Sequence, residues 1–219
     1  MYVPPHFAAP GKETLIRLLP TASFATLVSI GEEGRPVATH LPFCYDETRG
    51  ENGTLIAHMA RANPHGNILE RGEALVIFQG PHVYISPSYY ATEINVPTWN
   101  YVAVHVYGRP KIIEDPAKVR HLLDRLTHEN EKDMENPWRA DQLDDRRLKG
   151  LMQGIIAFEI PLSRIEGKAK LGQNKSAVDQ AGVEEVQFLA AWPFRYSSDR
   201  ISIRRETVRA NSKLPSPAV

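Results

Sequence analysis

The sequence has almost no cysteine, no long apolar run and no excess of either charge. Cys44 is the one cysteine in 219 residues, which excludes an intrachain disulfide framework and a cysteine-rich zinc site, and indicates a reducing compartment. Lys plus Arg and Asp plus Glu number 26 each, so the whole chain lacks the basic excess that attracts nucleic acid. The first residues lack a secretory signal, and no run of about 18 apolar residues occurs. We therefore expect a soluble, cytoplasmic protein.

The length is sufficient for one domain with a full core. We expect this domain to span residues 1–192, followed by a basic tail over 193–219. Within the tail, the run Arg200–Arg205 suits either a nucleic-acid patch or a solvated basic segment. Cys44 lies in the apolar run Leu41–Tyr45, so we expect a buried structural thiol there.

Short apolar and alternating runs predict strands that are grouped in hairpins. The expected strands are 24–30, 36–44, 54–59, 74–79, 82–86, 98–114 with a break near 108–110, and 155–160 with a continuation over 162–171. Turns are expected at Gly31–Gly34 and at Gly80–Pro81. Strands in this order favour a mostly antiparallel barrel decorated by helices over a doubly wound parallel sheet.

Five helices are predicted, at 11–19, from Asn63 for a short distance, at 117–131, at 142–152 and at 176–191. The third has Asp115–Pro116 as its start and an apolar stripe at Val119, Leu122, Leu123 and Leu126. The fourth is strongly charged, and we expect it to pack through Leu143, Leu148 and Leu151.

The stretch His58–Leu69 indicates a phosphate site. Asn63–Pro64 is a strong helix start, because Asn63 suits the N-cap and Pro64 needs no N–H at the first helical position. The amides of a helix start and the guanidinium of Arg61 beside it would together bind a phosphate. A capped helix with a surface arginine is the alternative interpretation. No Gly-x-Gly-x-x-Gly or Walker A pattern supplies another nucleotide signature.

Several ordered motifs resemble those of the PaiB family of FMN-binding negative transcriptional regulators. They are Met1–Phe7, Thr39–Phe43, His58–His65, Gly80–Pro87, Val96–Tyr101, Ala103–His105, Tyr107–Gly108 and Lys170–Lys175. The similarity extends to about residue 192. Three positions differ from the family pattern: Gly66 replaces an aromatic residue, Tyr89 a tryptophan and Gly172 a serine.

The resemblance implies an α+β, mostly β, fold: the FMN-binding split β-barrel, antiparallel and of Greek-key type, related to pyridoxamine phosphate oxidases. It also implies a homodimer with FMN in the groove between the subunits. Residues expected to contact the cofactor are Thr39, His40, His58, Met59, Ala60, Arg61, Asn63, His65, Trp99, Gln173, Asn174 and Lys175. In this scheme Arg61 and Asn63 hold the phosphate, and Trp99 and Tyr101 flank the ring or fill the dimer seam.

Each of these residues also has a purely structural interpretation. Histidines on strands, such as His40 and His58, are often satisfied core or interface residues, Trp99 suits the core or a dimer interface, and Gln173–Lys175 suits the cap of the last helix. No metal site is expected, because no His-x-x-x-His pair occurs. The leading function is a flavin-responsive regulator of transcription. A flavin-dependent oxidoreductase and a haem-handling split barrel are the alternatives, although no catalytic constellation is evident.

Overall fold

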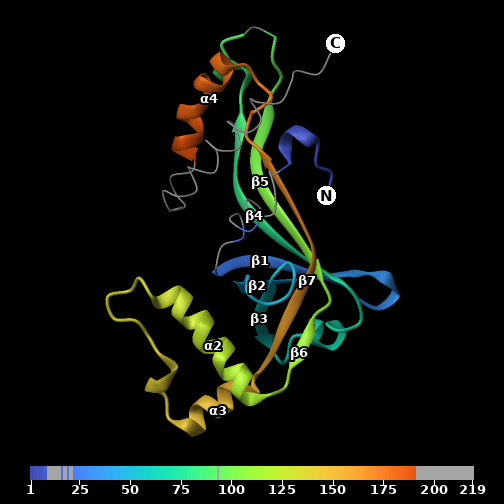
Figure 1. Cartoon of the computed structure of the whole chain (residues 1–219), viewed down its shortest axis with the longest axis vertical. Coiled ribbons are helices and arrows are strands. Elements are labelled where there is room, and N and C mark those ends of the chain that lie inside the picture. Colours follow the sequence, from blue (N-terminus) through green and yellow to red (C-terminus); the bar gives the residue numbers. More distant parts are fainter. Residues whose placement is uncertain (9–15, 17–18, 20–21, 93, 191–219) are drawn as a thin grey trace. The chain divides into compact units, whose positions relative to one another are not determined.

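The computed structural model describes residues 1–8, 16, 19, 22–92 and 94–190. Seven strands form one sheet in the order β3-β2-β1-β4-β5-β7-β6, and an additional pairing of β3 with β7 closes it (Figure 1). The strands are β1 (Ala22–Ile30), β2 (Pro36–Asp46), β3 (Thr54–Ala60), β4 (Ala74–Ile85), β5 (Thr98–Gly108), β6 (Lys111–Ile113) and β7 (Ile155–Lys170). The predicted mostly antiparallel barrel is thus confirmed.

Three α-helices and five short 3-10 helices accompany the strands in the described part of the chain. The α-helices are α2 (Pro116–Glu131), α3 (Asp145–Gln153) and α4 (Ala177–Ala190), and the 3-10 helices are Pro5–Phe7, Glu32–Gly34, Pro64–Ile68, Pro87–Tyr89 and Ala140–Gln142. None of the described helices is both long and apolar enough to cross a membrane. The predicted helix 11–19 lies largely outside the described residues, and the predicted tail 193–219 lies wholly outside them.

The chain forms two compact units. The first, here called the barrel unit, comprises residues 19–78 and 105–165, and the second, the hairpin unit, comprises 1–18, 79–104 and 166–219. Strands β4, β5 and β7 have residues in both units.

The barrel unit begins with the predicted hairpin. β1 and β2 pair antiparallel from Ala22 opposite Cys44 to Ile30 opposite Pro36. Left-handed backbone at Glu33 and Gly34, with φ of 56° and 73°, makes the tight connection. The core between the strands includes Phe43, whose ring lies edge-on to those of Phe78 and Phe158 at centroid distances of 6.1 and 6.3 Å.

Helix α2 covers a second apolar cluster in the barrel unit. Its N-cap is Asp115, which accepts a hydrogen bond from the Ala117 N–H at 2.9 Å. Three residues of the predicted stripe are buried against β2, β3 and β7, and the fourth, Leu123, is partly buried. The buried residues of this cluster are Cys44, Ile56, Val119, Leu122, Leu126 and Ala157. Cys44 is fully buried, so the expectation of a structural thiol is confirmed.

Helix α3 differs from its prediction in both start and packing. Asp144 is the N-cap and accepts from the Arg147 N–H at 2.9 Å, so the helix starts at Asp145 and not at Gln142. None of its residues is buried, and the Leu151 side chain is 57% exposed. The apolar spacing identified the helix correctly, but α3 contributes little to the core of the described structure.

Two further predictions about local structure were wrong. The segment after Asn63 forms a 3-10 helix of five residues and not an α-helix. Gly80–Pro81 does not end a strand, because β4 continues through it to Ile85. A Cβ at Gly80 would lie 3.0 Å from the Val102 Cβ, so glycine here permits close approach of a neighbouring strand and does not mark a turn.

In the hairpin unit, α4 lies beside the loop between β4 and β5 (Figure 1). The helix starts near its predicted position: the Asp179 N–H donates to Ser176 Oγ at 3.2 Å, as at a capped N-terminus. Asp179 is itself buried and accepts hydrogen bonds from the N–H and hydroxyl of Thr92, both at 3.0 Å. These contacts hold the loop against the first turn of α4.

Candidate functional site

The predicted cap at Asn63 is present in the barrel unit. Asn63 Oδ1 accepts from the His65 N–H at 3.0 Å, and Pro64 occupies the first position of the 3-10 helix. The Gly66 N–H donates to the Asn63 carbonyl, also at 3.0 Å. The chain itself therefore uses the two amides that follow Pro64, and side chains must supply most of the grip on any phosphate here.

Arg61, which directly follows β3, is held by the end of helix α3. Its Nε donates to the Gln153 carbonyl and its Nη2 to the Ile155 carbonyl, both at 2.7 Å. Its backbone N–H donates to the carbonyl of Gly154, the C-cap of α3, at 2.9 Å. The guanidinium thus caps the carbonyl end of a helix, where a positive charge is favoured.

One edge of this guanidinium stays available. A guanidinium carries five N–H groups in a planar fork, and the bonds to Gln153 and Ile155 use the edge formed by Nε and Nη2. Within the described part of the chain, Nη1 has no hydrogen-bond partner, and the Arg61 side chain is exposed. The edge formed by Nη1 and Nη2 can accordingly donate two parallel hydrogen bonds to a pair of anionic oxygens.

A buried polar network lies behind the cap. Thr39 Oγ1 accepts from Asn63 Nδ2 at 3.3 Å and lies 2.8 Å from His65 Nδ1. A hydroxyl can donate one hydrogen bond and accept two, so either Thr39 Oγ1 or His65 Nδ1 can be the donor, depending on the tautomer of the imidazole. The His65 side chain is 1% exposed, and its Nε2 has no partner among the described residues. Burial lowers the pKa of His65, so the ring is neutral.

The other expected barrel residues divide between interior and surface. Met59 is buried, and Ala60 is exposed. His58 is half-buried, burial lowers its pKa, and its Nδ1 has no partner within the described chain. The His40 ring is exposed and stacks on Phe24 with a centroid distance of 6.4 Å. Of this set, His40, Ala60 and Arg61 are accessible to a molecule at the surface.

Phe24 and His40 belong to an apolar outer face of the β1–β2 hairpin. Residues paired across the two strands point to the same side of the sheet, and Phe24, Thr26, Val28 and Ile30 are paired with Pro42, His40, Ala38 and Pro36. The side chains of Phe24 and Ile30 are 68% and 57% exposed. Large exposed apolar side chains on one face of a hairpin are typical of an interaction site.

The remaining predicted residues lie in the hairpin unit. Trp99 is 53% exposed and contacts the rings of His82 and Tyr84 at centroid distances of 6.2 and 5.8 Å. Gln173 closes the turn after β7, since its Nε2 donates to the Ala169 carbonyl at 2.6 Å and its Oε1 accepts from the Leu171 N–H at 2.8 Å.

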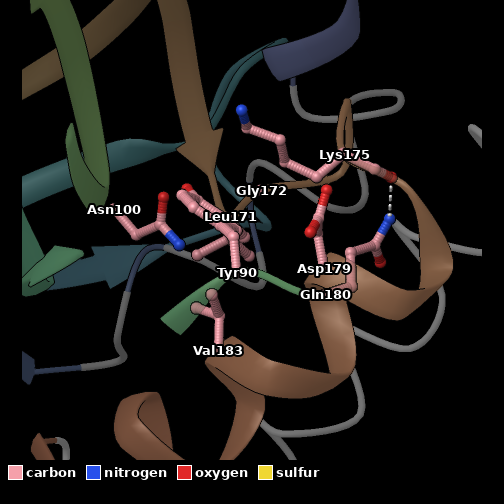
Figure 2. Close-up of a pocket in the computed structure, with 8 residues that line it drawn as sticks. All are labelled: Tyr90, Asn100, Leu171, Gly172, Lys175, Asp179, Gln180 and Val183. Atoms are coloured by element: carbon pink, nitrogen blue, oxygen red, sulfur yellow. Dashed lines mark hydrogen bonds between the residues drawn. The ribbon is translucent and has the colours of Figure 1, made fainter. Parts of the chain in front are cut away.

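Lys175 and its neighbours line a small pocket, whereas Asn174 is exposed. Lys175 Nζ donates to Asn95 Oδ1 at 2.6 Å and lies 4.7 Å from the centre of the Tyr90 ring. Figure 2 shows the pocket, which is lined by Tyr90, Asn100, Leu171, Gly172, Lys175, Asp179, Gln180 and Val183. The empty volume of this pocket is about 190 Å³, including the part that is open to solvent. Pockets for drug-sized ligands have volumes of roughly 300–1,000 Å³. FMN does not fit inside it.

Two residues of this pocket escaped the sequence interpretation. Asn100 is 3% exposed and lines the pocket. Only its place on an alternating strand hinted at burial. Asp179 had a clearer signal, because Ser176-x-x-Asp179 follows the capping-box spacing.

Comparison with known proteins identifies the family. Residues 1–164 match the family described as "Putative FMN-binding domain". The chain belongs to this family. "Protease synthase and sporulation protein PAI 2" of Bacillus subtilis is 38% identical over 186 residues, which cover 84% of this chain and 88% of the relative. The PaiB resemblance inferred from the motifs is thereby confirmed. An uncharacterized protein of Emericella nidulans is 32% identical over 182 residues, covering 67% and 72%.

Solved structures agree with this membership at the level of the fold. A "putative 5-nitroimidazole antibiotic resistance protein" from Bacteroides thetaiotaomicron superposes with a TM-score of 0.55 at 18% identity, over 74% of this chain and 85% of that chain. A conserved hypothetical protein, Rv2991, from Mycobacterium tuberculosis gives 0.52 at 12% identity, over 80% and 94%. The fold is the split β-barrel of the FMN-binding family.

Proposed function

We propose that this protein binds FMN between two copies of the chain and acts as a flavin-responsive negative regulator of transcription. The observation that carries the proposal is the orientation of Arg61. Its guanidinium is fixed on the carbonyls of Gln153 and Ile155 and keeps one edge for a phosphate. A guanidinium that is already held in place loses less rotamer entropy on binding an anion than a mobile guanidinium does. When bound, the isoalloxazine ring of FMN would supply one- or two-electron redox chemistry.

The dimer is supported by the outer face of the β1–β2 hairpin. Phe24 and Ile30 expose large apolar surfaces there, and a second copy would bury them in a two-fold interface. His40, stacked on Phe24, adds a flat ring at the same face, which suits contact with an aromatic cofactor. Regulation of transcription rests on the PaiB resemblance and on the relative whose name refers to sporulation and protease synthesis.

A comparison of FMN with riboflavin tests the phosphate site directly. Mass spectrometry of the small molecule released on denaturation should identify FMN. Arg61→Ala should weaken FMN binding by about 10- to 150-fold, because a hydrogen bond to a charged group contributes about 1.5–3 kcal/mol. The same change should leave riboflavin affinity unaltered.

Arg71→Ala is the matched control, since Arg71 is an exposed arginine whose ion pair with Glu32 is long, at 3.6 Å. It should bind FMN as the wild type does. Equal affinity of the wild type for FMN and riboflavin would refute the phosphate site.

Light scattering on the eluting protein tests the dimer. Ile30→Asp places a charge on the outer face and should convert the dimer to a monomer that has lost FMN. Ile94→Asp is the control, because Ile94 is 98% exposed but lies in the hairpin unit. A dimeric Ile30→Asp variant would exclude this face as the interface.

Regulation is tested by complementation of a deletion strain. Transcripts that rise on deletion should fall again with the wild-type protein and stay high with Arg61→Ala. If both proteins repress equally, FMN is not the signal. Bleaching of the flavin by NAD(P)H, with turnover, would favour the oxidoreductase instead.

A further inference from the structure

Arg61 connects two parts of the barrel unit that are far apart in sequence. Three of its N–H groups, Nε, Nη2 and the backbone amide, donate to the carbonyls of Gln153, Ile155 and Gly154. These carbonyls form the end of α3 and the turn into β7. The bond from Nε to Gln153 therefore depends on whether the last turn of α3 is formed, whereas Ile155 is held in β7 by its pairing with Ala60.

Besides these bonds, α3 is attached to the apolar cluster under α2 mainly through Met152, which is partly buried there. None of its nine residues is buried, and Leu151 on its apolar side is 57% exposed. Gly150, in the middle of the helix, lowers helix propensity and has no atom within 4 Å of the place where a Cβ would stand. A short helix with these properties belongs to the least stable part of a domain and opens more easily than the barrel strands.

We infer that α3 is a positioning element for the phosphate site and that phosphate binding and α3 formation stabilise each other. This inference rests on the proposed function, because it takes the ligand on Arg61 to be the FMN phosphate. The carbonyls of Gln153, at the end of α3, and of Ile155 use the Nε–Nη2 edge, and the phosphate uses the Nη1–Nη2 edge, so both can bind the same guanidinium at once. Either partner then fixes the side chain for the other, and the coupling is reciprocal.

Hydrogen exchange measures the coupling in the wild-type protein. FMN should slow amide exchange in a peptide covering residues 145–155, whereas riboflavin, which lacks the phosphate, should leave this peptide unchanged. Faster exchange with FMN would mean that α3 and the phosphate compete for Arg61, and that result would overturn the inference. An unchanged rate with bound FMN would overturn it as well.

Substitutions at Gly150 test the same coupling without touching the ligand site. Gly150→Pro breaks α3 and should weaken FMN binding about five-fold or more, with riboflavin unaffected. Gly150→Ala is the matched control at the same position: it favours the helix and should slow exchange over residues 145–155 without loss of FMN affinity. Amide exchange in the β3 peptide, residues 54–60, should stay at the wild-type rate in both variants, which would show that the barrel remains folded.

The two proposals fail in different ways. If wild-type protein binds no FMN, the proposed function fails and the inference fails with it. If the wild type and Gly150→Pro bind FMN equally well, only the inference is wrong, and Arg61 must be held by other means.

Discussion

The ion pair between Arg125 and Asp46 should contribute far more stability than the other arginine pair on α2. Arg125 Nη1 donates to Asp46 Oδ2 at 2.6 Å and Nη2 donates to the Tyr45 carbonyl at 3.1 Å, which attaches α2 to β2. Asp46 is buried and also accepts from the N–H and hydroxyl of Thr48. Removal of Arg125 therefore leaves the buried Asp46 carboxylate with only its hydrogen bonds from Thr48.

The magnitude follows from these contacts. Loss of a charged hydrogen bond costs about 1.5–3 kcal/mol, and the Thr48 bonds that remain keep the cost below the 3–5 kcal/mol of a wholly broken buried pair. We expect Arg125→Ala to lower the free energy of unfolding by about 2–3 kcal/mol. Arg120→Ala, on the same helix, removes an exposed pair with Asp124 and should cost about 0.5 kcal/mol. Both variants change Arg to Ala in the same helix, so the change in helix propensity contributes equally to both and cancels when their free energies of unfolding are compared.

Urea unfolding as a function of pH is the assay. Burial alone would raise the pKa of Asp46, but the hydrogen bonds from Thr48 and Arg125 outweigh it and lower the pKa. A carboxyl with a lowered pKa stabilises the fold above its unfolded pKa of about 3.9 and loses this contribution as pH falls through the folded value. The difference between wild type and Arg125→Ala should be constant from about pH 5 to 8 and shrink below about pH 4. Equal losses in the two variants, or a difference that persists in acid, would refute the reasoning.

Further predictions concern glycine and the cap. Gly53→Ala should severely destabilise the protein, since φ is +80° and its Cβ would lie 2.3 Å from the Tyr45 ring, whereas Gly34→Ala, with φ of +73° and open space, should cost about 1–2 kcal/mol in thermal unfolding. Asn63→Ala should lose about 1 kcal/mol with the cap, visible as a lower thermal midpoint. Because burial lowers the pKa of His65, its proton is taken up on unfolding, and stability should fall as pH drops below about 6.5. His65→Phe should reduce the slope of this limb of the urea-derived stability curve, with the remainder due to His58, whose pKa burial also lowers. An unchanged limb would assign it to His58 or another group.

Local signals predicted those parts of the fold that local interactions determine. Asp115–Pro116, Asn63–Pro64 and the glycines of the first hairpin each act within a few residues, and each lies where the sequence placed it. Gly80–Pro81 has the same local signature as a turn, yet the approach of Val102 keeps the strand continuous. Such a long-range contact cannot be read from neighbouring residues.

The candidate site shows the same division. The sequence indicated Arg61 and the Asn63 cap, but the partners of Arg61 are more than 90 residues away and no spacing rule connects them. The sequence showed only that Gly66 stands where the family pattern has an aromatic residue. The structure buries it, with a Cβ position 2.5 Å from Ile156 Cδ1, because the short 3-10 helix turns this residue inward.

The pairing of β3 with β7 also has a consequence for how the chain is made. One edge of β3 pairs with β2, but the other finds its partners only at Pro161 to Ile155, about a hundred positions later. A nascent chain that ends earlier therefore presents an open strand edge to its surroundings. Such an edge recruits other strands. Prematurely terminated products of this gene should consequently aggregate or require chaperones, even though every residue of the first hairpin is already present in them.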